Sequence, residues 1–206
     1  MAKEVNYKLE KNRNQLAKDC VKSKASRNTA LKLLKSDSRV ERQYGATIIT
    51  MALQQDAHCF VDNAQDLFDS LLNPEIQTVW QCLESLKILV ENGFIKLKAK
   101  DVNTVIDKLY DTSGRIRKAA FSLICKHGAS SKKASIQIWE QIEPVIKTFN
   151  GQVEFSEMLN DLIDFIKEDI DLQVSENLAN FMKNYAFSAS GILRKRAKEI
   201  VDWHTA

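Results

Sequence analysis

The sequence predicts an all-α protein, an α-α superhelix of about five helix pairs that follow an N-terminal cap helix. The first observation is composition: 206 residues hold only 6 Gly and 2 Pro, which leaves little material for hairpins. The second is a repeated phrase, SGRIRKAAFSLI at 113–124 and SGILRKRAKEIV at 190–201. The third is that apolar stripes at helical spacing recur about every 38 residues. Together they favour a stacked helical repeat.

The second, inner helix of each predicted pair is located by an apolar stripe along one helical face. In the clearest case the stripe is Ile116, Ala119, Ala120, Leu123 and Ile124. The first residues of the five stripes, which we use as anchors, are Val40, Ile76, Ile116, Phe155 and Leu193. For the first repeat, Gly45 and Ile49 give a competing stripe. Each anchor is expected to be buried where neighbouring repeats stack.

The first, outer helix of each pair precedes its anchor. The predicted outer helices span residues 27–36, 62–73, 100–111, 134–150 and 175–188. Turn residues separate the paired helices, as at Asn73-Pro74, Asn150-Gly151 and Ser190-Gly191. Serine at such a joint is a preferred N-cap, so Ser113 is expected to cap its inner helix.

The sequence divides into a basic N-terminal cap helix at residues 1–26 and a single-domain repeat array at residues 27–206. Val5, Leu9, Leu16 and Val21 lie on one rough face of the cap helix, which would cover the first repeat. Residues 1–35 carry a net charge of +7 and the remaining 171 residues carry −4. The basic helix is either a solvated cap or a contact for nucleic acid, an acidic protein or a membrane surface.

The inner-helix phrases DTSGRIRKAAFSLI and SDSRVERQYGATII resemble the inner helices of HEAT repeats. The resemblance covers residues 27–204, although NPEIQTVWQCLESL and QVEFSEMLNDLI lack the arginine. It implies an α-solenoid whose inner-helix surface usually binds proteins and sometimes binds nucleic acid. Armadillo-like and vesicle-adaptor superhelices are close alternatives.

No motif for catalysis or metal binding emerges, so the sequence predicts a protein that is not an enzyme and carries no cofactor or metal. It has no GxGxxG, GxxxxGK[ST] or HExxH motif. His58 and Cys59 are adjacent, so on a helix they point about 100° apart. Cys125 and His127 have no second ligand pair at metal-binding spacing.

One enzymatic alternative comes from a further resemblance. A HEAT-like class of alkylpurine DNA glycosylases uses a concave basic surface with tryptophan and a carboxylate. Trp80 with Glu84, and Trp139 with Glu143, have the matching one-turn spacing. Both tryptophans lie among apolar residues and are interpreted as packing residues. Trp203 is expected to close the end of the core.

The predicted partner-binding face consists of residues just off the core stripe of the inner helices. Two residues after the anchors stand Arg42, Thr78, Lys118, Glu157 and Lys195, and one residue before them stand Arg39, Glu75, Arg115, Glu154 and Ile192. The predicted partner-binding residues are Arg39, Arg42, Arg115, Lys118, Glu154, Glu157 and Lys195.

Charge along this face changes sign from one repeat to the next, and the sign change bears on the choice of partner. Residues 112–133 hold six bases and no acid, whereas residues 154–176 hold eight acids and one base. A groove for nucleic acid would stay positive along its length. The sequence therefore favours a partner protein with a mixed-charge surface, with a nucleic-acid-binding protein as the alternative.

The expected location is cytoplasmic, or more broadly intracellular, with the nucleus included. The four cysteines are far apart and form no CxxC pair, which is typical of a reducing compartment. No stretch of 18 apolar residues occurs, so membrane insertion is not expected.

Overall fold

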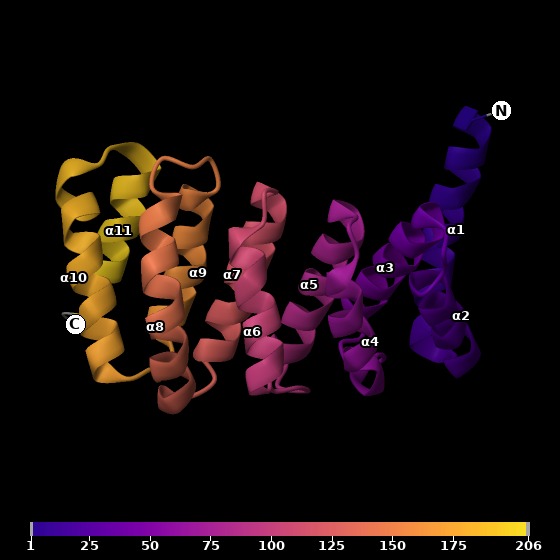
Figure 1. Cartoon of the computed structure of the whole chain (residues 1–206), viewed down its shortest axis with the longest axis horizontal. Helices are drawn as coiled ribbons and strands as arrows, with labels where there is room; N and C mark the ends of the chain where they lie inside the picture. The colour runs from indigo at the N-terminus through magenta and orange to yellow at the C-terminus, as the bar shows by residue number, and fades with distance from the viewer. Residues whose placement is uncertain (1, 205–206) are drawn as a thin grey trace. The chain divides into compact units, whose positions relative to one another are not determined.

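The computed structural model describes residues 2–204, with side chains from residue 12 onward, and in this range the chain is built from α-helices and short 3-10 turns (Figure 1). Its residues group into two compact units, residues 1–97 and residues 98–206. The predicted boundary between residues 26 and 27 falls inside a helix, so the division into a cap and a single array stays a prediction.

Unit 1 begins with the predicted N-terminal helix. Its elements are α1 Ala2–Lys22, α2 Lys24–Leu34, α3 Arg39–Leu53, a 3-10 turn at Val61–Asn63, α4 Ala64–Asp69, a 3-10 turn at Ser70–Leu72 and α5 Ile76–Glu91. Helix α1 packs against α2 and α3 through Ala17 and Cys20, which are fully buried. Leu16 and Val21 are only half-buried, and the predicted Val5 and Leu9 lie outside the described side chains.

Helices α2 and α3 approach each other closely at a glycine. A Cβ atom on Gly45 would lie 2.5 Å from the backbone nitrogen of Leu34 and 2.9 Å from the carbonyl oxygen of Ala30. No larger residue fits there without a backbone shift. The predicted anchors of this unit are wrong, because Val40 is 64% exposed and Ile76 is 51% exposed. The competing stripe that contains Gly45 and Ile49 is the buried one.

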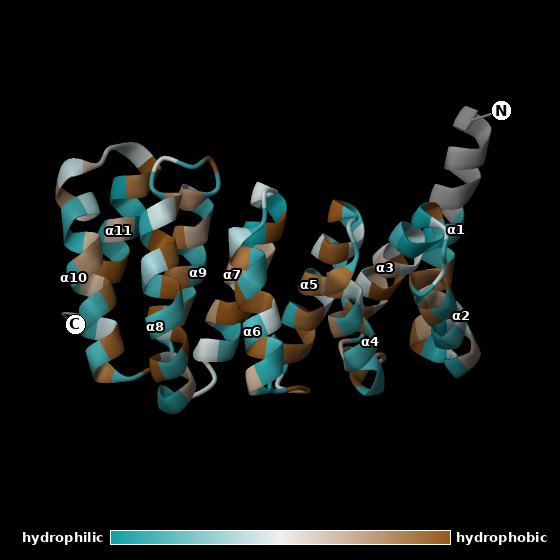
Figure 2. Ribbon diagram, viewed as in Figure 1, coloured by the Kyte–Doolittle hydropathy of each residue, from teal (hydrophilic) through white to brown (hydrophobic). Residues whose placement is uncertain are grey.

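Unit 2 contains three helix pairs arranged in two layers. Its elements are α6 Ala99–Asp107, a 3-10 turn at Lys108–Tyr110, α7 Gly114–Gly128, α8 Lys132–Phe149, α9 Phe155–Lys167, α10 Leu172–Ser188 and α11 Gly191–His204. Helices α6, α8 and α10 form the outer layer, and α7, α9 and α11 form the inner layer (Figure 1). Hydrophobic and hydrophilic residues alternate along these helices (Figure 2), and the buried side chains are mainly hydrophobic. Here the anchors Ile116 and Phe155 are buried as predicted, and Leu193 is half-buried.

The inner helices begin at residues 39, 76, 114, 155 and 191, so the predicted anchors stand at different places in the first turn. The expected cap at Ser113 is wrong, because its side chain accepts no hydrogen bond from the helix start. Instead the Asp111 carboxylate accepts a hydrogen bond from the Ser113 backbone at 2.8 Å. Asp171 does cap α10, accepting from two backbone N–H groups. The expectation for Trp203 is also wrong, because that side chain is 49% exposed.

Candidate protein-binding surface

Arg42, predicted to bind a partner, is engaged inside unit 1. It is the fourth residue of α3, and its guanidinium forms an ion pair with Glu75, the N-cap residue of α5. The Nε–Oε2 distance is 3.2 Å, and Nη1 also donates to the carbonyl oxygen of Ser36 at 2.7 Å. The two side chains are 17% and 7% exposed. Hydrogen bonding from Arg42 lowers the pKa of Glu75 below its ordinary value.

Unit 2 contains the same arrangement. Arg117, the fourth residue of α7, pairs with Glu154, the N-cap residue of α9, with an Nε–Oε1 distance of 3.0 Å. Nη1 of Arg117 donates to the carbonyl oxygen of Asp111 at 2.9 Å, and the guanidinium lies 5.8 Å from the ring centre of Phe149. We call each arginine–glutamate pair an inter-helix clamp, because it ties one inner helix to the start of the next.

The clamps explain where two of the predicted binding residues lie. Arg42 and Glu154 have most of their charged surface covered within the fold, so they position helices. The residue of unit 2 that corresponds to Arg42 is Arg117, whereas the anchor spacing selected Lys118. The two positions differ because Val40 is the second residue of α3, whereas Ile116 is the third residue of α7.

A second row of paired side chains crosses from α7 to α9 on the solvent side of the inner helices. Lys118 Nζ lies 2.7 Å from Glu157 Oε2, Ser122 donates to Asp161 at 2.8 Å, and Lys126 donates to Asp164 at 3.3 Å. We call these six residues the α7–α9 seam. Its first pair is well exposed, with side chains 42% and 60% accessible, and hydrogen bonding from Lys118 lowers the pKa of Glu157.

Further pairs of the same kind link α9 to α11. Lys167 Nζ lies 2.7 Å from Glu199 Oε1, and Arg196 Nη1 donates to the Ser156 hydroxyl at 3.1 Å. The bases of α7 thus face the acids of α9, and the base of α9 faces an acid of α11. The basic residues of one repeat therefore pair with acidic residues of the next repeat within unit 2. This pairing reduces the unpaired charge on this face.

The remaining predicted binding residues are exposed. Arg39 lies at the start of α3, Arg115 at the start of α7 and Lys195 in the first turns of α11. Thr78, which the same spacing placed on this surface, is 0% exposed. Thr78 therefore contributes nothing to the surface of unit 1.

Of the candidate catalytic and base-binding residues, Trp139 is buried, the two glutamates pair with lysines, and Trp80 is half-buried. Trp139 is 4% exposed in the core of unit 2, where it cannot stack on a nucleobase. Glu84 pairs with Lys87 at 2.7 Å and Glu143 with Lys147 at 3.0 Å, each on its own helix. Burial raises the pKa of the Cys59 thiol to about 12, which opposes thiolate chemistry. Among the described residues, no group of three or more His, Cys, Asp or Glu side chains could hold a metal.

The residues that sequence reasoning missed are Arg117 and the pairing role of the two N-cap glutamates. A signal was present: Ser-x-x-x-Arg occurs at 38–42, 113–117 and 190–194 before inner helices, although it also occurs at 23–27 at the start of α2. Alignment on this spacing brings Arg42, Arg117 and Arg194 together, each the fourth residue of an inner helix.

Comparison with solved structures confirms the predicted fold class. An engineered protein matches with a TM-score of 0.72 and 13% identity, over 94% of this chain and 88% of its own. A designed armadillo repeat protein in complex with the peptide (KR)4 matches with a TM-score of 0.71 and 13% identity, over 97% and 94% of the two chains. Computationally designed armadillo repeat proteins for modular peptide recognition match with a TM-score of 0.68 and 12% identity, over 95% and 92%. The chain therefore has an all-α helical-repeat fold of the HEAT and armadillo type.

Sequence-based comparisons give no further assignment. No family model matches the chain, and no curated protein matches it. Within the helices that the structure describes, none is both long enough and apolar enough to cross a membrane.

Proposed function

We propose that this protein is a non-enzymatic scaffold that binds another protein through the solvent side of its inner helices. The observation that carries the proposal is the α7–α9 seam, whose Lys118–Glu157 pair is well exposed, on a fold shared with proteins designed for peptide recognition. Exposed ion pairs contribute little to stability, so a partner can exchange them for contacts of its own at small cost.

The predicted binding residues divide into proposed partner contacts and residues that hold helices together. Lys118, Glu157, Arg115 and Lys195 are the proposed partner contacts in unit 2, and Arg39 is the proposed contact in unit 1. Arg42 and Glu154 support the surface by holding inner helices together in their clamps.

A protein partner fits this surface better than nucleic acid does. A phosphate backbone that followed the lysines of α7 would meet Glu157 and Asp164, which lie at 2.7 and 3.3 Å from Lys118 and Lys126. Repulsion from these carboxylates would offset the phosphate contacts. Because all four cysteines are free thiols, we also propose an intracellular location.

The test is a charge exchange on the seam. The double variant Lys118→Glu/Glu157→Lys keeps an internal ion pair and the net charge but exchanges the positions of the positive and negative groups. We expect it to fold with nearly wild-type stability and to capture less of the native partner in pulldowns from cell extract, read by mass spectrometry. The matched control is Lys147→Glu/Glu143→Lys on the outer helix α8, an exposed pair of the same kind.

Two outcomes would contradict the proposal. Capture that is unchanged by the seam exchange would show that the inner face is not the binding surface. Recovery of nucleic acid alone, with tighter binding by Glu157→Lys because a repelling charge becomes a phosphate contact, would establish the alternative.

A further inference from the structure

An open pocket lies between α10 and α11, outside the α7–α9 seam. Its volume is about 730 Å³, and its lining is mainly apolar. Ala186, Phe187 and Val201 contribute apolar surface, and Phe187 is 88% exposed. The charged residues that line it are Lys183, Arg194, Lys198 and Asp202. Three bases against one acid give the pocket a net positive charge.

Arg194 occupies the same place in its phrase as Arg117, 77 residues earlier. Arg117 is held by the Glu154 carboxylate, whereas Arg194 is exposed and its Nε donates to the carbonyl oxygen of Ala186 at 3.2 Å. No carboxylate pairs with Arg194 in the part of the chain that the structure describes. The place that Glu154 takes beside Arg117 is thus open to solvent beside Arg194.

The same alignment shows that this surface differs from the one that internal repeats bury. Lys198 stands where Phe121 packs edge-to-face on Phe149, with ring centres 6.3 Å apart, and Asp202 stands where Cys125 is buried. A helix pair that stacked here as α8 and α9 stack on α7 would bury Lys198 and Asp202, which is costly. A short segment that leaves these charges at the rim avoids the cost.

We propose that this α10–α11 pocket binds an acidic segment of a partner protein. A carboxylate of the segment pairs with Arg194 as Glu154 pairs with Arg117, while Lys183 and Lys198 attract its remaining negative charge. A neighbouring apolar side chain packs against Phe187 and Val201. The inference rests on the proposed function, since it takes the chain to bind proteins, and it adds a second surface with a defined ligand chemistry.

The experiment is a selection of random displayed peptides on the immobilised full-length chain, followed by affinity measurements with synthetic copies of the enriched peptides. We expect enrichment of Asp or Glu beside Leu, Phe or Trp. Arg194→Glu and Lys198→Glu should each weaken binding by about tenfold or more, because a paired charge becomes a repelling one. Phe187→Ala should weaken binding without changing its salt dependence.

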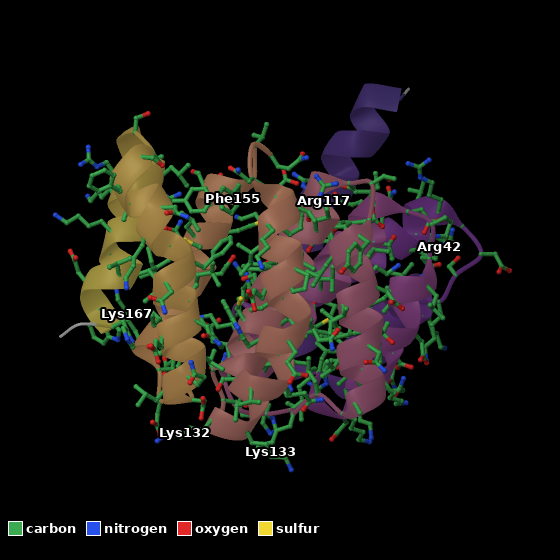
Figure 3. The ribbon with its side chains drawn as sticks, turned by 60° about the vertical axis from the view of Figure 1, so that its left-hand side comes forward. Arg42, Arg117, Lys132, Lys133, Phe155 and Lys167 are labelled. Carbon is green, nitrogen blue, oxygen red and sulfur yellow. The ribbon has the colours of Figure 1, made fainter. Side chains whose placement is uncertain are left out.

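The matched control is Lys133→Glu, an exposed lysine at the opposite end of unit 2 from Arg117 and Phe155 (Figure 3). It makes the same change of net charge and should leave affinity unchanged. Since Arg194, Lys198 and Phe187 are exposed, their variants should fold, and circular dichroism checks this.

Each other outcome overturns the pocket proposal in a recognisable way. Peptides that lose binding to Lys118→Glu/Glu157→Lys but not to Arg194→Glu would keep the proposed function and remove this pocket from it. Enrichment of basic peptides would contradict the ligand chemistry. A dimer in sedimentation that Arg194→Glu dissolves would show that a second copy fills the pocket. A selection without enriched peptides would contradict the pocket proposal, whereas the pulldown with Lys118→Glu/Glu157→Lys decides the proposed function separately.

Discussion

The two copies of the repeated phrase, at residues 113–124 and 190–201, occupy different environments in one unit. In the first copy Arg117 is largely covered by its clamp, and a Cβ on Gly114 would lie 2.9 Å from the Glu154 carboxylate. In the second copy Arg194 is exposed, and nothing lies within 4 Å of a Cβ on Gly191. The same local sequence therefore starts both helices, but the arginine pairs with a carboxylate in the first copy and donates to the carbonyl oxygen of Ala186 in the second.

The residues that differ between the two copies reflect the same difference in environment. Phe121 is 1% exposed between helices, and the aligned residue on the open side of α11 is Lys198. Apolar residues in the first copy thus become charged residues in the second where no described helix covers them.

Phe121 and Lys198 are aligned in the two copies, and placing each residue at the other position should have unequal effects on the free energy of unfolding. We expect Phe121→Lys to lower the free energy of unfolding by about 4 kcal/mol, because it buries a charge and removes the Phe149 contact. Lys198→Phe should change it by less than about 1 kcal/mol, since the site is exposed. Urea denaturation measures both, and similar losses in the two variants would contradict the difference in environment.

The aligned aliphatic residues should also differ. Ile116 is 3% exposed and Leu193 is half-buried, so Ile116→Asp should cost about 3 kcal/mol and Leu193→Asp about half as much. Denaturation midpoints at fixed pH provide the comparison, and Leu193→Ala separates the lost packing from the added charge. A larger loss for Leu193→Asp than for Ile116→Asp would mean that the second copy is more deeply packed than the structure shows.

Much of the fold was predictable from the sequence, because the repeat period and the apolar stripes identify helices that stack. The outer helix predicted at 134–150 is found at Lys132–Phe149. The segment predicted as one helix at 62–73 is divided into two 3-10 turns around α4. Apolar side chains such as Val40 point to solvent in a first turn that extends past the core, and a stripe in sequence cannot reveal this.

The binding face was less predictable than the fold. Whether a charge is free depends on which residue of a neighbouring helix lies opposite, and this requires the register between helices. Glu75 and Glu154 look alike in sequence to the exposed acid Glu157, yet only the first two are N-cap residues beside an arginine.

His127 makes the stability of unit 2 depend on pH. It is 7% exposed, its Nδ1 has no hydrogen-bond partner, and burial lowers its pKa from the ordinary 6.5. Below pH 6.5 the unfolded chain therefore binds more protons than the folded chain, so the free energy of unfolding should fall as the pH decreases through that value. Denaturation curves above and below pH 6.5 should show a smaller decrease for His127→Gln. An equal decrease in this variant would assign the pH dependence to other groups.

The smallest effect is expected at the start of α7. Ser113 makes no side-chain cap, so Ser113→Ala should change the free energy of unfolding by less than about 0.5 kcal/mol. Asp171 caps α10 and serves as the positive control, with a loss of about 1 kcal/mol for Asp171→Ala. Thermal melts suffice, and equal losses in the two variants would restore Ser113 as a cap.

The clamp itself is tested most directly by a double-mutant cycle on Arg117 and Glu154. Unfolding free energies of Arg117→Ala, Glu154→Ala and the double variant should give a coupling of about 1 to 2 kcal/mol, because the pair is largely shielded from water. The same cycle on the exposed Lys118 and Glu157 should give about 0.5 kcal/mol or less. A coupling between Arg117 and Glu154 that is no larger than the one between Lys118 and Glu157 would contradict the clamp.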